Sequence, residues 1–197
     1  MKMNVDFDAH GAFARAVAFA AYAHDGQRRK GGALPYIVHP METAAIAATM
    51  TDDCEVLAAA VLHDVVEDCG VTAEELRQRF GPRVAALVTS VSEEKFADAA
   101  GTWRLRKQRA LERLCTAGRE TMILALSDKL SNLRSLDRDL RAQGPAVWLQ
   151  FNQTDPAMHR WYYTAMGEAL SMLAQTDAHR EYRALLNRVF GAEEEHP

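Results

Sequence analysis

The sequence predicts one all-α domain of about eight to ten helices. Apolar residues recur at helical spacing through most of its 197 residues, and no segment shows the sustained alternation of a half-buried strand. Hydrophobic residues (48%) and charged residues (25%) stand in the balance typical of a globular protein. We therefore expect a single domain over residues 1–197, with its motifs within about 10–140 and further helices over 145–190.

The expected helices follow one another with short connections. The segment 56–66 is so apolar that we expect a helix buried on most sides. Thr72, followed by Glu74 and Glu75, is typical of a helix N-terminus, and that helix must end before Gly81 and Pro82. The other expected helices cover residues 13–23, 42–50, 84–91, 103–115, 120–136, 156–173 and 178–190. Two loops stand out, a basic glycine-rich loop at 26–35 and a polar loop at 92–102.

Charge and cysteine usage exclude several classes of function. A net charge of −4 lacks the basic excess of a non-specific nucleic-acid binder, although a small polyphosphate ligand needs only a local basic patch. The three cysteines form no CxxC pair, so neither a disulfide framework nor a cysteine zinc site is indicated. No signal core and no apolar run of about 18 residues is present, so we expect a cytoplasmic protein without a membrane partner.

The segment 63–68, with the sequence HDVVED, carries four ionisable side chains. On a helix that turns about 100° per residue, His63, Glu67, Asp64 and Asp68 share one arc of about 140°. Such groups are costly to bury unless they are compensated, and a divalent cation would compensate His63 and Asp64 directly. An exposed acidic helix end is the alternative, and the apolar run before His63 favours burial.

Two further residues are candidate ligands. Asp128 interrupts an otherwise apolar helix, where an aspartate needs either a metal or a basic partner such as Lys129 or Arg134. Asn132 follows one turn later on the same face. His39, which precedes a proline at a helix start, could be a ligand, a cap or a packing residue.

Four blocks of sequence together resemble the HD superfamily, whose pattern is H…HD…D around a divalent ion. They are HDGQRRK (24–30), PYIVHP (35–40), AAVLHDVVED (59–68) and LALSDKLSNLR (124–134). Their order and spacing are similar to the hydrolase domain of the RelA/SpoT alarmone enzymes, and above all to the stand-alone small alarmone hydrolases. The resemblance therefore implies a single HD-domain helical bundle.

The resemblance also implies a reaction and a site. It implies a Mn²⁺-dependent pyrophosphohydrolase that removes the 3′-diphosphate from alarmone nucleotides of the stringent response, such as (p)ppGpp or (p)ppApp. The implied metal ligands are His39, His63, Asp64 and Asp128. Glu67 and Asp68 are the pair that the resemblance assigns to positioning or activating the attacking water.

The resemblance places Arg29 and Lys30 beside the nucleotide base, with Asn132 and Ser135 in the same pocket. A solvated loop is the alternative for the basic run 28–30. Contacts to phosphate could also arise further along the chain, but there we expect a solvated surface. These residues are Lys95, Arg106 and Lys107.

The chain departs from the family pattern in three places. The loop 31–34 is one residue longer than the common form, and Lys129 and Ser131 stand where many relatives carry arginine and histidine, which leaves the choice of base open. Beyond residue 140 the match fades, and we expect the aromatic cluster there to be a helix-packing core or an oligomer contact. This cluster is Trp148, Phe151, Asn152, Trp161, Tyr162 and Tyr163. No role is expected for histidines 10, 24, 159, 179 and 196.

Two other functions stay open. One is a metal-dependent phosphatase of other phosphorylated nucleotides, such as NADPH, since the same centre suits several phosphoesters. The other is a non-catalytic module that binds alarmones, although retention of Glu67 and Asp68 favours catalysis. In each case the partner is a small nucleotide and not a nucleic acid, and a homo-oligomer is possible.

Overall fold

A computed structural model describes residues 11–93 and 101–191 of the chain, and these residues confirm the all-α fold class. Within them the only strand-like pairing is one isolated bridge between Arg28 and Pro35. The helices are α1 (Ala12–Ala23), α2 (Val38–Ala47), α3 (Cys54–Leu62), α4 (Val65–Asp68), α5 (Ala73–Phe80), α6 (Pro82–Val91), α7 (Trp103–Cys115), α8 (Arg119–Gln143), α9 (Pro156–Ala169) and α10 (Asp177–Phe190). Two 3-10 helices, η2 (Gly144–Gln150) and η3 (Ser171–Leu173), flank α9.

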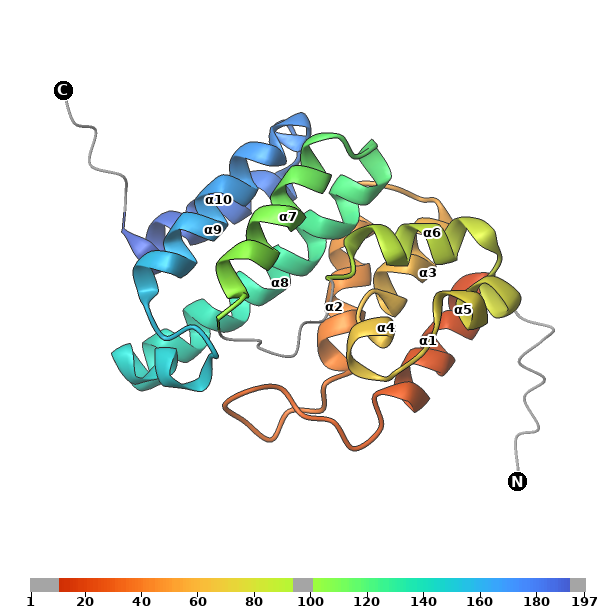
Figure 1. Ribbon diagram of the computed structural model, residues 1–197, viewed down its shortest axis with the longest axis horizontal. Helices are drawn as coiled ribbons and strands as arrows, with labels where there is room; N and C mark the ends of the chain where they lie inside the picture. The colour runs from red at the N-terminus through yellow and green to blue at the C-terminus, as the bar shows by residue number, and fades with distance from the viewer. Residues whose placement is uncertain (1–10, 94–100, 192–197) are drawn as a thin grey trace.

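Helix α8 is the centre of the bundle. It packs against α2, α3 and α6 on one side and against α10 on the other, and Figure 1 shows it between the early helices and the late ones. Leu126, Leu130 and Leu133 on α8 are completely buried. Each contributes roughly 1.5–3 kcal/mol by burial of its side chain. A polar residue on this helix is therefore held in a fixed position by the packing around it.

Local signals set several helix ends as expected. The hydroxyl of Thr72 accepts a hydrogen bond from the backbone N–H of Glu75 at 3.1 Å and so caps α5. Gly81 then separates α5 from α6 with a φ of +90°, which a glycine adopts without strain. Pro82 opens α6 at a position where no backbone donor is needed.

The expected helix over 56–66 is broken in the structure. Helix α3 ends at Leu62, and the chain turns through His63 and Asp64 before the short α4 begins. The arc of four side chains on one continuous helix was therefore a wrong prediction. Successive residues of an unbroken helix diverge by about 100°. The turn instead lets His63 and Asp64 approach the same point, their Nε2 and Oδ2 atoms lying 3.0 Å apart.

Other boundaries differ less. Helix α2 begins at Val38, four residues before its expected start, so His39 lies in its first turn. Helix α8 continues to Gln143, beyond the expected end at 136. None of the described helices is both long enough and apolar enough to cross a membrane.

An ion pair joins α8 and α10, the two helices that pack most extensively against each other. Asp137, 4% exposed, accepts hydrogen bonds from Nε and Nη2 of Arg188, both at 2.7 Å. Arg141 adds a third bond at 2.7 Å from within α8. The hydrogen bonds from Arg188 are the main reason that the pKa of Asp137 is lowered.

We expect Asp137→Asn to lower the melting temperature by about 2–4 °C near neutral pH, because charge-assisted hydrogen bonds between α8 and α10 are lost. The folded-state pKa is below the ordinary aspartate value of about 3.9, so the wild-type advantage is complete above that value. It disappears as the pH falls through the lowered pKa. Thermal unfolding followed by circular dichroism from about pH 7 to about pH 3 measures this. A difference that stays constant or grows in acid would contradict the assignment.

Candidate functional site

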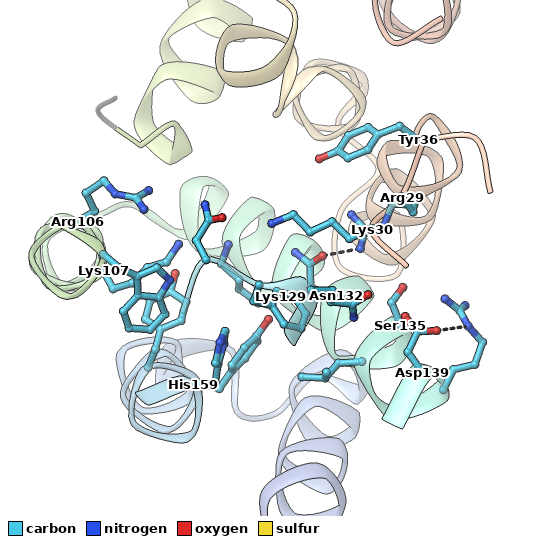
Figure 2. Close-up of a pocket in the computed structure, with 18 of the residues that line it drawn as sticks. Arg29, Lys30, Tyr36, Arg106, Lys107, Lys129, Asn132, Ser135, Asp139 and His159 are labelled. Atoms are coloured by element: carbon cyan, nitrogen blue, oxygen red, sulfur yellow. Dashed lines mark hydrogen bonds and ion pairs between the residues drawn. The ribbon is translucent and has the colours of Figure 1, made fainter. Parts of the chain in front are cut away.

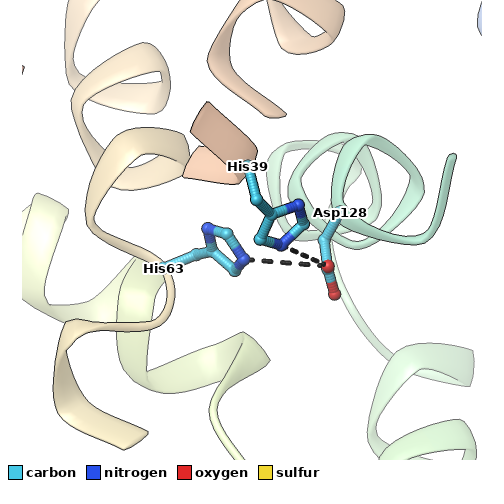
Figure 3. Close-up of side chains that lie close together, drawn as sticks. All are labelled: His39, His63 and Asp128. Carbon is cyan, nitrogen blue, oxygen red and sulfur yellow. Dashed lines mark ion pairs between the residues drawn. The ribbon is translucent and has the colours of Figure 1, made fainter. Parts of the chain in front are cut away.

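Four predicted ligand residues converge where α2, α8 and the α3–α4 turn meet. His39 Nε2 lies 3.3 Å from Asp128 Oδ1 and 3.5 Å from Asp64 Oδ2. His63 Nε2 lies 3.0 Å from Asp64 Oδ2 and 3.7 Å from Asp128 Oδ1. The ligand atoms of His39, His63 and Asp128 all lie within 4.8 Å of one another (Figure 3). Asp64 joins them through its contacts with both imidazoles, and its Oδ2 also accepts a hydrogen bond from the Tyr36 hydroxyl at 2.7 Å.

The chemistry of this cluster fits a cation. His63 Nδ1 must donate to the carbonyl of Ala60, 2.9 Å away, because a carbonyl oxygen only accepts. His63 Nε2 is buried, and among the described residues no hydrogen-bond partner satisfies it. A buried polar atom is costly when it is left without a partner. Two imidazoles and two carboxylates without a thiolate form a donor set that suits divalent ions such as Mn²⁺.

The electrostatics of the cluster point the same way. Burial disfavours a charged imidazole, yet the negative charge of Asp64 raises the pKa of His63 well above its usual value. Burial likewise disfavours ionised Asp128, but Lys129 and the imidazoles hold the pKa of this carboxyl well below its usual range. The site therefore keeps its carboxylates ionised and attracts positive charge.

Asp128 has a basic partner in addition to the histidines. Its Oδ2 accepts a hydrogen bond from Lys129 Nζ at 2.5 Å, and its Oδ1, which faces the imidazoles, accepts one from Asn132 at 2.5 Å. Arg134 does not reach Asp128 and binds Glu42 and Glu181 instead. Both alternatives posed by the sequence for Asp128, a salt bridge to Lys129 and a place among candidate ligands, are therefore realised together.

Glu67 and Asp68 lie on α4, directly after the candidate ligand Asp64. Glu67 Oε1 accepts a hydrogen bond from the backbone N–H of Glu93 at 2.6 Å. Burial and the nearby charge of Asp64 raise the pKa of Glu67 to about 7. A carboxyl group with such a pKa can exchange a proton near neutral pH, which is what a general base requires.

A cavity of about 390 Å³ opens beside this cluster. Its volume is in the range of small-molecule sites. All four residues predicted to bind substrate line it, and so do Asp68, Tyr36 and Lys129, of which the last two hydrogen-bond to the candidate ligands. The predicted substrate-binding residues are Arg29, Lys30, Asn132 and Ser135. Arg29 donates a hydrogen bond to Asn132 at 2.7 Å, which joins the basic loop to α8 in the wall of the cavity.

The expectation of a solvated surface at Arg106 and Lys107 is wrong. Their side chains are 17% and 16% exposed, and both line the cavity from α7 while they pair with Glu93. Figure 2 shows them on the opposite side of the cavity from Arg29 and Lys30. Lys95, grouped with them in the sequence analysis, lies outside the described residues.

The chain beyond residue 140 supplies a cavity wall, where the sequence predicted helix packing or an oligomer contact. Phe151, Asn152, Tyr162 and Tyr163 line the cavity, whereas Trp148 packs in a small core with Leu136, Val147 and Val189. His159, for which no role was expected, also lines the cavity. Its ring lies 5.2 Å from those of Trp148 and Phe151. Clustered aromatic residues look alike in a core and in a cavity wall, so the sequence held no signal that separates the two.

Among the described residues, the remaining histidines have packing roles. His24 is buried and stacked on Tyr36, with ring centroids 4.8 Å apart. His179 is buried, and its Nε2 lies 3.1 Å from the carbonyl oxygen of Gly167. Histidines 10 and 196 lie outside the described residues.

Comparison with known proteins gives a consistent set of relatives. A family model described as the HD domain matches residues 16–154. A guanosine-3′,5′-bis(diphosphate) 3′-pyrophosphohydrolase, MESH1, of Drosophila melanogaster is 37% identical over 142 residues, which cover 70% of this chain and 74% of the relative. The enzyme of the same name from Vibrio cholerae is 41% identical over 117 residues, 58% of this chain. The match spans only 16% of that much longer protein.

Solved structures support the same likeness. The structure of a protein described as a metazoan ortholog of SpoT that hydrolyses ppGpp superimposes with a TM-score of 0.73 at 25% identity. The match covers 93% of this chain and 98% of that one. A protein from Listeria monocytogenes matches with a TM-score of 0.70 at 30% identity, over 78% of this chain and 99% of that one.

The convergence of the candidate ligands predicts that a divalent cation stabilises the fold. Adding Mn²⁺ to chelator-treated protein at about 100 times its dissociation constant should raise the free energy of unfolding by about 2.7 kcal/mol. His63→Ala and Asp64→Ala should remove this gain, because each takes away a donor atom. Asp137→Ala, a matched change remote from the cluster, should keep it. Thermal unfolding with and without Mn²⁺ measures the gain, and a full gain in His63→Ala would show that the ion binds elsewhere.

Proposed function

Because this chain belongs to the HD-domain family, and within it to the type of guanosine-3′,5′-bis(diphosphate) 3′-pyrophosphohydrolases, we propose that it is a Mn²⁺-dependent hydrolase of alarmone nucleotides. It removes the 3′-diphosphate from substrates such as (p)ppGpp or (p)ppApp. One observation supports this above all. Two imidazoles and two carboxylates converge at the edge of a cationic cavity of nucleotide size.

In this proposal His39, His63, Asp64 and Asp128 hold the metal. When bound, the metal supplies Lewis-acid polarisation of the phosphoryl oxygen and makes water more acidic. The reaction adds water across the bond between the ribose 3′-oxygen and phosphorus. The water oxygen goes to pyrophosphate, a proton goes to the 3′-oxygen, and a nucleoside di- or triphosphate is released.

Glu67 and Asp68 act on the attacking water, which Glu67 deprotonates and Asp68 positions. Glu67 is suited to accept it, since its pKa of about 7 leaves a large ionised fraction at neutral pH together with appreciable basicity. The backbone N–H of Glu93 fixes one of its carboxylate oxygens. Asp68, one residue further on α4, lines the cavity and positions the water from the substrate side.

Two groups of cationic residues line the cavity and contact different parts of the substrate. Arg29 and Lys30, with Asn132 and Ser135, bind the base and ribose side. Arg106 and Lys107 face them from α7 and bind phosphate, for which their pairing with Glu93 keeps them in place. Aromatic side chains of the C-terminal wall offer a surface on which a purine can stack.

We extend the proposal to the setting of the enzyme. Residues 1–197 act as one hydrolase domain, with a nucleotide and not a nucleic acid as the partner, in keeping with the net charge of −4. The cytoplasmic location remains a prediction of the sequence analysis, and the three cysteines, which are free thiols, agree with it.

The products distinguish this function from its alternatives. Purified protein is incubated with Mn²⁺ and ppGpp, pppApp or NADPH, and the products are separated and identified. Pyrophosphate from an alarmone supports the proposal. Orthophosphate from NADPH, with no pyrophosphate from any alarmone, would identify a phosphatase instead, and tight binding without turnover would identify a binding module.

Replacing Glu67 tests its role as a base. Glu67→Gln keeps the size and the hydrogen bond to Glu93 but cannot accept a proton, so we expect turnover to fall by about 10²–10⁴-fold. The Mn²⁺ content should stay unchanged, since Glu67 is not among the proposed ligands. Glu74→Gln, a matched change at an exposed site on α5, is the control. An unchanged rate in Glu67→Gln would remove this residue from the mechanism.

A further inference from the structure

The two imidazoles of the cluster are oriented by different kinds of partner. His63 donates through Nδ1 to the backbone carbonyl of Ala60, a bond that does not depend on the side chain at position 60. His39 instead places Nδ1 at 2.8 Å from the hydroxyl of Ser131, a side chain on α8 that is fully buried. The orientation of His39 therefore depends on which side chain stands at position 131.

Ser131 belongs to a chain of hydrogen bonds that runs away from the cluster. Its hydroxyl donates to Glu42 Oε2 at 2.7 Å. Glu42 Oε1 accepts a bond from Arg134 at 3.0 Å, and Arg134 is anchored in turn by two bonds of 2.7 Å to Glu181 on α10. Helices α2, α8 and α10 are thereby linked by polar contacts behind His39.

The direction of these bonds follows from the chemistry of the groups. A carboxylate paired with an arginine can only accept, so the single hydroxyl proton of Ser131 points to Glu42. The oxygen of Ser131 then offers only lone pairs to His39, and Nδ1 of His39 must carry the proton. Nε2 of His39 is left with its lone pair directed at the centre of the cluster, near Asp64 and Asp128.

We propose that Ser131 and Glu42 are positioning residues that fix the tautomer of His39 in which Nε2 is free to bind the divalent cation. The proposal rests on the proposed function, because it assigns a role in binding the same metal. Partners of this kind behind a metal-bound histidine orient its ring and increase its basicity. Neither residue touches the substrate cavity, so their effect on the reaction is indirect.

Loss of the hydroxyl has a specific consequence. In Ser131→Ala the buried Nδ1 of His39 has no acceptor for its proton. The proton is then better placed on Nε2, where Asp128 Oδ1 at 3.3 Å and Asp64 Oδ2 at 3.5 Å can accept it. A metal must displace that proton before it binds.

The test is a calorimetric titration of the chelator-treated protein with Mn²⁺. We expect Ser131→Ala to weaken binding by about 10–100-fold. Ser131→Thr, which restores a hydroxyl, should recover most of the affinity. Ser127→Ala is the matched control, because Ser127 is also fully buried on α8 but donates to the carbonyl of Ile123 at 2.7 Å. It should stay within about twofold of wild type, and equal losses in both alanine variants would overturn the proposal.

Glu42 is tested separately with Glu42→Gln. A neutral amide oxygen accepts the bond from Ser131 with less polarisation, so we expect a smaller but measurable loss of Mn²⁺ affinity. Unchanged affinity in this variant would remove Glu42 from the relay.

A measurement without metal separates this proposal from the proposed function. Long-range ¹H–¹⁵N spectra of the metal-free wild type should show a proton on Nδ1 of His39, and spectra of Ser131→Ala should show it on Nε2. An unprotonated Nδ1 in the wild type would overturn the relay. Wild-type protein that binds no Mn²⁺ would overturn the metal-dependent function, while the spectra would still decide the tautomer.

Discussion

The structure depends on how it compensates two carboxylates and two imidazoles that are enclosed where α2, α3 and α8 meet. Burial alone would neutralise Asp64 and Asp128, yet both have pKa values well below the usual range, because His63 and Lys129 supply positive charge nearby. Apolar packing along α8 prevents these groups from separating and becoming hydrated. A cation at the point where their lone pairs meet would compensate the buried charge of both carboxylates and bind both imidazoles.

That requirement explains the local irregularity of the chain. The helix break at His63 and Asp64 interrupts the regular helical backbone inside an apolar segment. Because of this break, two adjacent residues direct their side chains to one point. Asp128 needs no such break, since the middle of a long packed helix already aims it at the same place, with Lys129 and Asn132 bonded to its two oxygens.

The sequence was informative where chemistry requires particular residue types and less so where it requires only shape. Histidine and aspartate inside apolar segments indicated a cluster, and the structure brings those side chains together. The helix break was missed because no glycine or proline marks it. Arg106 and Tyr162 were missed as cavity residues, because a cation or an aromatic ring on a helix surface has the same pattern whether a neighbouring helix leaves a cavity or fills the space.

In the proposed function, the early and late parts of the chain contribute differently to the site. The proposed ligands and the Glu67–Asp68 pair lie within the 16–154 segment that matches the HD domain family. His159, Tyr162 and Tyr163 lie beyond it, on α9, and complete the cavity wall. The reacting atoms need the same geometry whichever base is attached to the ribose, whereas the base meets the residues that surround the rest of the cavity. Under the proposed function, preference among guanine and adenine nucleotides is thus expected to follow the C-terminal wall and the basic loop, while the hydrolytic step follows the proposed metal cluster.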